Sequence, residues 1–216
     1  MFRREFFILC TLATAIFLMV AVAGFWIGHT ISTDAGKIAA DTFPSLVDAG
    51  SAMTLAQDNW LRVQLLANTA SATDQSMLIE QIGANSNEGL WRDYGQSIYD
   101  AEERQEYQQL LFDRTNYLRL RDEYFALIRG NQNSVARDFL QDKLTPAYER
   151  YREISNRLFQ YNANSGRIRA ARLIWISRLA PLVLGVCAII IFVLGLIAGM
   201  RGVLTGLNLA SRFPKR

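Results

Sequence analysis

Two long uncharged runs place the strongest constraint on how this chain can fold. Residues 6–31 and residues 179–200 contain no Asp, Glu, Lys or Arg, and Arg178 and Arg201 bracket the second run. An α-helix rises about 1.5 Å per residue, so each run is roughly 33–39 Å long as a helix, enough to cross a hydrocarbon core of about 30 Å. The sequence therefore predicts transmembrane helices over residues 6–31 and 179–200.

The segment between the two runs, residues 32–178, has the charge content of a soluble domain. It carries 17 Lys and Arg residues and 19 Asp and Glu residues, so the net positive charge of the chain comes from the predicted tails, residues 1–5 and 201–216. A surface that binds nucleic acid needs a basic excess on the soluble part of a protein. We therefore expect contact with membrane lipid and no nucleic-acid partner.

The basic residues that flank the two runs bear on membrane topology. Six Lys and Arg residues lie in the tails and five lie on the other side of the runs, so the charges alone are nearly balanced. The positive-inside rule holds for short segments, whereas a long domain is translocated despite its charges. We expect a protein of the bacterial inner membrane with both termini in the cytoplasm and residues 32–178 in the periplasm. In an alternative interpretation the first run is a cleaved signal peptide, because Ala21-Val22-Ala23 resembles a cleavage site.

The middle segment has helical periodicity almost throughout. Its first helix carries a seam whose members are alternately three and four residues apart, as in a heptad repeat. The seam consists of Ala49, Met53, Ala56, Trp60, Val63, Ala67 and Ala70. Because its alanines would let another helix approach closely, we predict that this seam is the contact surface of a homodimer.

Three further helices are predicted after the first. The second begins near Ser71 and is weakest at residues 83–89, where glycine and asparagine favour a break. The third covers residues 101–128, and the fourth starts at Asn133 or Ser134 and is kinked or loosened by one turn at Pro146. We predict an all-α fold, an antiparallel four-helix bundle whose first and last helices are continuous with the two transmembrane helices.

The sequence contains little that would support catalysis. Its single histidine, His29, lies at the end of the first run, and both cysteines, Cys10 and Cys187, lie inside the runs. No phosphate-binding loop, hydrolase nucleophile motif or zinc-protease motif occurs. We therefore expect neither an enzyme nor a metal or cofactor site.

Arginine is the residue type that most suggests ligand binding. The middle segment has 15 arginines and 2 lysines, and the guanidinium group pairs with carboxylates through two parallel hydrogen bonds. The candidate ligand-binding residues are Arg62 with its neighbour Trp60 on the first helix, Arg121 on the third and Arg150 on the fourth. The alternative is that these arginines form surface ion pairs, such as Asp58 with Arg62.

Several segments occur in an order that is typical of one family. They are a basic tail and apolar run, then residues 42–46 (TFPSL), Arg62, residues 91–94 (WRDY), residues 100–107 (DAEERQEY), residues 121–130 (RDEYFALIRG), Pro146 and Tyr148. In this layout, residues 1–200 resemble the ligand-binding half of methyl-accepting chemotaxis receptors, a family with four-helix-bundle sensor modules.

The resemblance implies a sensory function in signal transduction. Such modules form dimers, bind a small ligand or a ligand-loaded periplasmic binding protein, and pass a shift of the last helix to a cytoplasmic partner. Only residues 201–216 follow the second run, whereas the family continues into a methylated coiled coil that contacts a kinase, so we do not expect this chain to control a kinase directly. Two alternatives are a membrane-anchored structural or adaptor protein and a truncated receptor without an output domain.

Overall fold

The computed structural model of the chain describes residues 2–69 and 71–210. Every element in these ranges is helical and no strand occurs in them, as the sequence predicts. Ala70 of the predicted seam, residues 211–216 of the predicted tail and the side chain of Cys10 lie outside the described part. The chain divides into two compact units, the bundle unit Gly36–Arg169 and an apolar unit formed by Met1–Ala35 and Ala170–Arg216.

The apolar unit contains most of helix α1 (Phe2–Lys37) and the C-terminal part of helix α7 (Thr145–Ala210). Its large apolar side chains are exposed along both helices, including Phe17, Val22, Phe25, Ile189 and Phe192. Both helices are long and apolar enough to cross a membrane. In a bilayer, lipid tails would cover these exposed side chains.

The first bundle helix, α2 (Phe43–Leu66), continues the helical backbone of α1 through one π-helical turn, η1 (Ile38–Thr42). Pro44 directly follows this turn, and because proline has no N–H it cannot complete the regular hydrogen-bond pattern of the continuous helix there. The predicted continuity between the first apolar helix and the first bundle helix is therefore confirmed.

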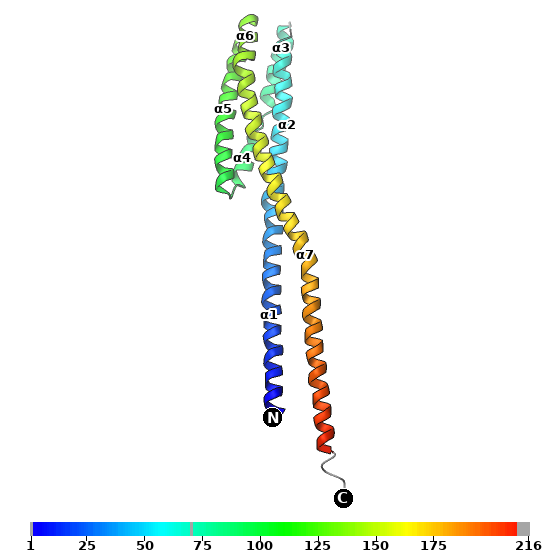
Figure 1. Ribbon diagram of the computed structural model, residues 1–216. Helices are drawn as coiled ribbons and strands as arrows, with labels where there is room; N and C mark the ends of the chain where they lie inside the picture. Colours follow the sequence, from blue (N-terminus) through cyan, green and yellow to red (C-terminus); the bar gives the residue numbers. More distant parts are fainter. Residues whose placement is uncertain (1, 70, 211–216) are drawn as a thin grey trace. The chain divides into compact units, whose positions relative to one another are not determined.

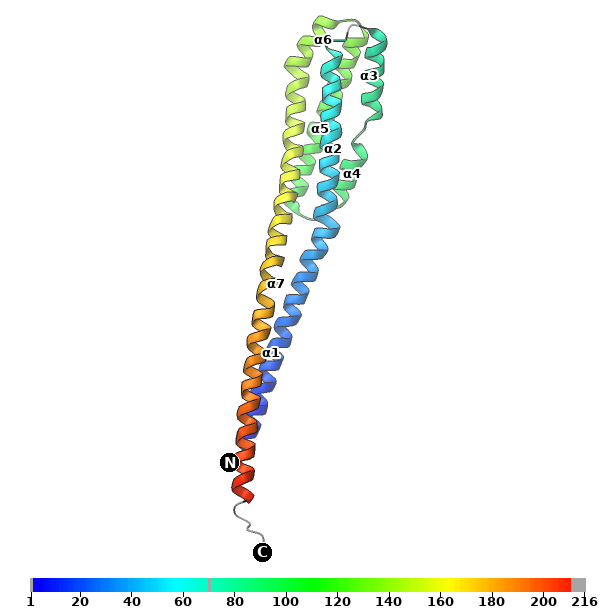
Figure 2. The ribbon, with the colours of Figure 1, turned by 90° about the vertical axis from the view of Figure 1, so that its right-hand side faces the viewer.

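The second helix of the bundle is divided in two, as Figure 2 shows. Helix α3 (Ala72–Ala84) begins at Ser71, whose side chain accepts a hydrogen bond from the Asp74 N–H at 3.3 Å. Residues 85–87 are not helical, and α4 (Glu88–Gln96) follows. The break thus lies within the stretch where glycine and asparagine predict it.

Helix α5 (Ala101–Arg129) begins at an aspartate, as a helix N-cap favours. The Oδ1 of Asp100 accepts a hydrogen bond from the Glu102 N–H at 2.8 Å, and this bond holds the pKa of Asp100 below its usual value. Gly130 follows the last turn. The predicted third helix, residues 101–128, is confirmed to within one residue.

The last helix begins as α6 (Asn133–Phe139), passes through a second π-helical turn, η2 (Leu140–Leu144), and continues as α7. Proline has no N–H, so Pro146 cannot bond to the carbonyl oxygen four residues earlier. In the adjoining π-helical turn, the Leu140 oxygen accepts from the Thr145 N–H, five residues later, and from the Thr145 hydroxyl at 2.8 Å. The loosened turn predicted at Pro146 is therefore present, and α7 continues without interruption into the second apolar stretch.

Within the bundle unit, α2, the α3–α4 pair, α5 and the α6–α7 helix lie side by side and alternate in direction (Figures 1 and 2). Aromatic side chains fill the centre. Trp60 stacks on Tyr148 at 4.3 Å between ring centroids, and Tyr117 stacks on Tyr151 at 5.8 Å. The antiparallel four-helix bundle is confirmed.

Three residues of the predicted dimer seam lie inside the bundle instead of on its surface, whereas Met53, Ala56 and Ala67 are half-buried. Ala49 and Val63 have no exposed surface, and Trp60 is 7% exposed, because all three pack against the other helices of the same bundle. The Ala49 position therefore cannot contact a second copy. The exposed apolar side chains of α2 form a different stripe, which consists of Phe43, Val47, Leu61 and Leu65.

Candidate functional site

The break between α3 and α4 brings an asparagine side chain into the core of the bundle. The Nδ2 of Asn87 donates to the Ala52 backbone oxygen at 3.1 Å and to the Tyr151 hydroxyl at 2.7 Å. Its Oδ1 accepts from the Nε of Arg114 at 3.2 Å. Asn87 thereby joins α2, α5 and α7 at one point, and the contact with Arg114 fixes which end of its amide is the acceptor.

Two more side chains complete this polar cluster. The Nε1 of Trp91 donates to the Tyr151 hydroxyl at 2.8 Å, and the Nδ2 of Asn59 donates to the Asn85 backbone oxygen at 2.7 Å. Burial raises the pKa of Tyr151 above its usual value. The Tyr151 hydroxyl is therefore neutral at physiological pH, and its oxygen accepts two hydrogen bonds.

A small cavity of about 160 Å³, here called the break cavity, adjoins this cluster. Its wall includes residues from α2, from the break and from α5 and α7, among them Asn59, Asn87, Glu88, Arg114, Tyr117, Arg121 and Tyr151. A single water molecule needs about 10–15 Å³ measured in this way, so the cavity has room for a small molecule.

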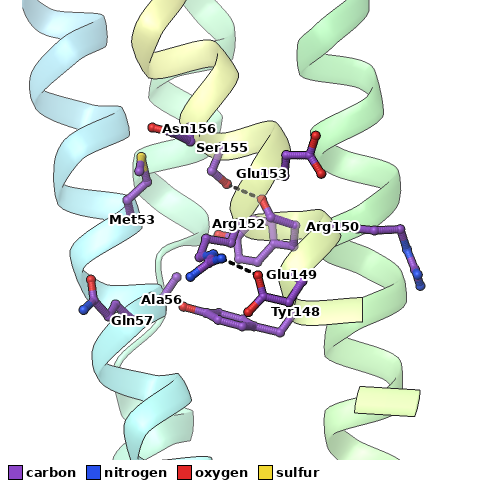
Figure 3. A pocket seen from close by; sticks show the side chains of 11 residues that line it. Met53, Ala56, Gln57, Tyr148, Glu149, Arg150, Arg152, Glu153, Ser155 and Asn156 are labelled. Carbon is purple, nitrogen blue, oxygen red and sulfur yellow. Dashed lines mark hydrogen bonds and ion pairs between the residues drawn. The ribbon is translucent and has the colours of Figure 1, made fainter. Parts of the chain in front are cut away.

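A larger and more open groove of about 500 Å³, here called the α2–α7 groove, lies between α2 and α7 (Figure 3). Met53, Ala56 and Gln57 form its α2 side, and the aromatic ring of Tyr148 lies on its α7 side. Arg152 lines it and is paired with Glu149. The groove therefore combines apolar surface with a charged pair that remains in contact with solvent.

The residues predicted to bind a ligand do not converge on one site. Trp60, predicted beside Arg62 as part of the ligand site, is a core residue stacked on Tyr148. Arg150 lines the α2–α7 groove, but its side chain is exposed and points away from α2 (Figure 3). These two residues therefore lie apart in the bundle, one in its interior and one on its surface.

The other two predicted residues lie nearer to the break. Arg62 is half-buried, and its Nη1 donates to the Oδ1 of Asn59 at 3.4 Å. The alternative ion pair with Asp58 is not among the ion pairs of the described residues. Arg121 lines the break cavity, pairs with Asp122 at 2.9 Å and lies over the Phe125 ring. Of the four predicted residues, Arg121 alone lines that cavity.

A second buried polar cluster lies where α2 begins. The Oε1 of Glu103 accepts from the Tyr94 hydroxyl at 2.7 Å and from the Nδ2 of Asn162 at 2.6 Å. Nearby, the Nη1 of Arg169 donates to the Thr42 hydroxyl at 2.7 Å and to Asp41 at 3.3 Å. These contacts tie η1 to α7 and α4 to α5 and α7, which is a structural role.

The polar residues that sequence reasoning missed are Asn87, Arg114 and Tyr151. The helical pattern predicts an exposed polar residue at Arg114 and an ordinary core aromatic residue at Tyr151. The only available signal is the polar sequence Asn85-Ser86-Asn87 between two helical stretches, since asparagine at a break can bond to backbone groups. Among the described residues, no group of three or more His, Cys, Asp or Glu side chains could hold a metal ion.

Comparison with known proteins gives one result that covers most of the chain. The sequence model of a family described as a four helix bundle sensory module for signal transduction matches residues 3–171. The match includes η1, all of the bundle helices and the break between α3 and α4. A comparison with curated proteins gave no match.

Proposed function

Because the chain belongs to the family of four-helix-bundle sensory modules for signal transduction, we propose that it is a two-span membrane sensor that acts as a homodimer. Its bundle lies in the periplasm, and both termini lie in the cytoplasm. Two observations support the membrane part of this proposal: two helices are long and apolar enough to span a bilayer, and their large side chains are exposed. The module senses a ligand and is not a catalyst.

The observation that carries the homodimer is the exposed apolar stripe of α2. Phe43, Val47, Leu61 and Leu65 are each at least half exposed, and they lie on one face of α2 as two pairs, each with a spacing of four residues, separated by turns that contain Gly50, Thr54 and Asp58. An isolated surface leucine needs no explanation, but an apolar stripe along a helix is typical of an interface. The stripe of one copy against the stripe of a second copy gives a symmetric contact, as in most soluble homodimers.

The ligand surface proposed for this sensor is the α2–α7 groove, whose Gln57 lies one helical turn before Leu61 of the stripe. Glu149 and Arg152, at 46% and 61% exposure, form a surface ion pair, and such pairs contribute only about 0–1 kcal/mol. An acidic group on a small ligand or on a binding protein could therefore replace Glu149 as the partner of Arg152 at little cost. Because Gln57 and Leu61 are neighbours on α2, occupation of the groove is expected to affect the dimer contact.

Cross-linking tests the homodimer. Leu61→Cys and Val47→Cys, each in a background with Cys10→Ser and Cys187→Ser, are expected to give disulfide-linked dimers in membranes under mild oxidation. Phe112→Cys is the matched control, because Phe112 is a 69% exposed apolar residue on α5. If Leu61→Cys forms no more dimer than Phe112→Cys, the proposed interface is wrong. Adducts with a different protein would favour the adaptor function instead.

Reporter fusions test the topology. A reporter fused after Arg216 is expected to be active only in its cytoplasmic form, and one inserted at Ser86 only in its periplasmic form, because residue 86 lies in the non-helical break of the bundle. The same location for both reporters would contradict the two-span topology. A mature protein that begins at Gly24 would show that α1 is cleaved.

A further inference from the structure

The break cavity contains hydrogen-bond donors that have no acceptor. The Tyr151 hydroxyl is satisfied by the side chains of Asn87, Trp91 and Ser155. The Tyr117 hydroxyl, in contrast, is buried and has no hydrogen-bond partner in the described part of the chain. A buried donor without an acceptor is costly, and native structures seldom leave one unmatched.

Arg114 adds further donors to the same cavity. Its Nε is bonded to Asn87, whereas Nη1 and Nη2 have no hydrogen-bond partner in the described part of the chain. The guanidinium group is half-buried, and the Asn87 contact holds it in place. Tyr117, with its unpartnered hydroxyl, and Arg114, with the free edge of its guanidinium group, thus both line a cavity of about 160 Å³.

The charges around the cavity are compatible with an anion. Arg121 is already paired with Asp122, so Arg114 carries the uncompensated positive charge. The acid in the cavity wall is Glu88, which is exposed and forms no ion pair with Arg114. An exposed carboxylate is screened by water, so it opposes an anion only weakly.

We propose that the break cavity is a second ligand site, inside a single bundle, that binds a small monocarboxylate. The carboxylate accepts hydrogen bonds from the planar guanidinium fork of Arg114 and from the Tyr117 hydroxyl. This site differs from the α2–α7 groove proposed above because it needs no second copy. The ligand holds the α3–α4 break to α5 and α7.

Thermal unfolding of the full chain in detergent tests this site. Sodium formate and sodium acetate are the probes, and sodium chloride at equal ionic strength is the control. Formate or acetate is expected to raise the melting temperature in a saturable way that chloride does not reproduce. If neither carboxylate does so, the proposal is wrong, whereas the cross-linking result for the homodimer is unaffected.

Two variants identify the donors. Tyr117→Phe removes only a hydroxyl without a partner, so it is expected to melt no lower than the parent protein without ligand and yet to bind acetate about 10- to 150-fold more weakly. Arg114→Gln is expected to abolish the acetate response. An unchanged acetate affinity in Tyr117→Phe would overturn the assignment even if Arg114→Gln fails to fold.

Two further variants are matched controls. Glu88→Gln removes the acid from the cavity wall and is expected to strengthen acetate binding. Arg119→Gln changes an exposed arginine that lines neither the break cavity nor the α2–α7 groove, and it is expected to leave acetate binding unchanged. Equal loss of binding in Arg119→Gln and Arg114→Gln would show that the effect is one of net charge alone, and would contradict a defined site.

Discussion

Replacing Asn87 by alanine is expected to lower the free energy of unfolding of the bundle by about 2–4 kcal/mol. The side chain makes three hydrogen bonds in the core, to Ala52, Arg114 and Tyr151. A hydrogen bond to a neutral group contributes about 0.5–1.5 kcal/mol and one to a charged group about 1.5–3 kcal/mol. Loss of Asn87 also leaves the Nε of Arg114 without its acceptor, which adds to the cost.

Denaturation of the full chain in detergent, followed by circular dichroism, measures this effect. Asn116→Ala is the matched control, because the Asn116 side chain accepts one exposed hydrogen bond from Arg119. A surface change of that kind is expected to alter the stability by less than about 0.5 kcal/mol. If Asn87→Ala is as stable as Asn116→Ala, the break is held together by apolar packing and the polar cluster contributes little.

The sequence predicts the helices of this protein better than it predicts their contacts. The break near residues 83–89 and the loosened turn at Pro146 are both present, since glycine, asparagine and proline act on the local backbone. The helix boundaries at Asp100 and Asn133 are set by local hydrogen bonds and short turns. Helix breaks and helix boundaries depend on a few neighbouring residues, so they can be predicted from the sequence without knowledge of the fold.

The proposed dimer surface could not be predicted in the same way. Helix α2 has two apolar stripes, one containing Ala49 and Trp60 and one containing Phe43 and Leu61. Periodicity shows that both stripes exist, but it does not show which one the other three helices cover. In the structure, the other helices cover the stripe that contains Trp60, because its large ring stacks on Tyr148 inside the bundle.

The polar sites depend on contacts between residues far apart in the sequence. Asn87 lies 27 residues from Arg114 and 64 from Tyr151, and it meets them only because α3 ends where it does. The arginines chosen from the sequence have the right chemistry, but side-chain direction decides their role. Arg150 points away from α2, whereas Arg114 is held at the break by Asn87.

Raising the pH above 10 is expected to unfold the bundle in one cooperative step. Tyr94, Tyr117 and Tyr151 are at most 3% exposed. In each case burial is the main cause that raises the tyrosine pKa above its usual value of about 10. Burial also raises the pKa of Tyr148 and of Tyr161, each to about 12.

The sign of the effect follows from the protons that each state holds. Between pH 10 and the raised pKa values, the unfolded chain loses tyrosine protons while the folded bundle keeps them, so the free energy of unfolding falls as the pH rises. One fully buried tyrosine costs about 1.4 kcal/mol at pH 11, and three cost about 4 kcal/mol. Domains of this kind are stable by only about 5–15 kcal/mol, so this loss is large.

Two signals recorded together on the full chain in detergent test the prediction. The part of the helical circular dichroism signal that comes from the bundle is expected to be lost between about pH 10 and pH 12, at the same pH at which tyrosinate absorbance near 295 nm rises. Tyr117→Phe removes one proton-releasing group, and its transition is expected to lie at a higher pH. Gradual ionisation of all tyrosines with an unchanged helical signal would contradict the prediction, because it would mean that these hydroxyls reach solvent without unfolding of the bundle.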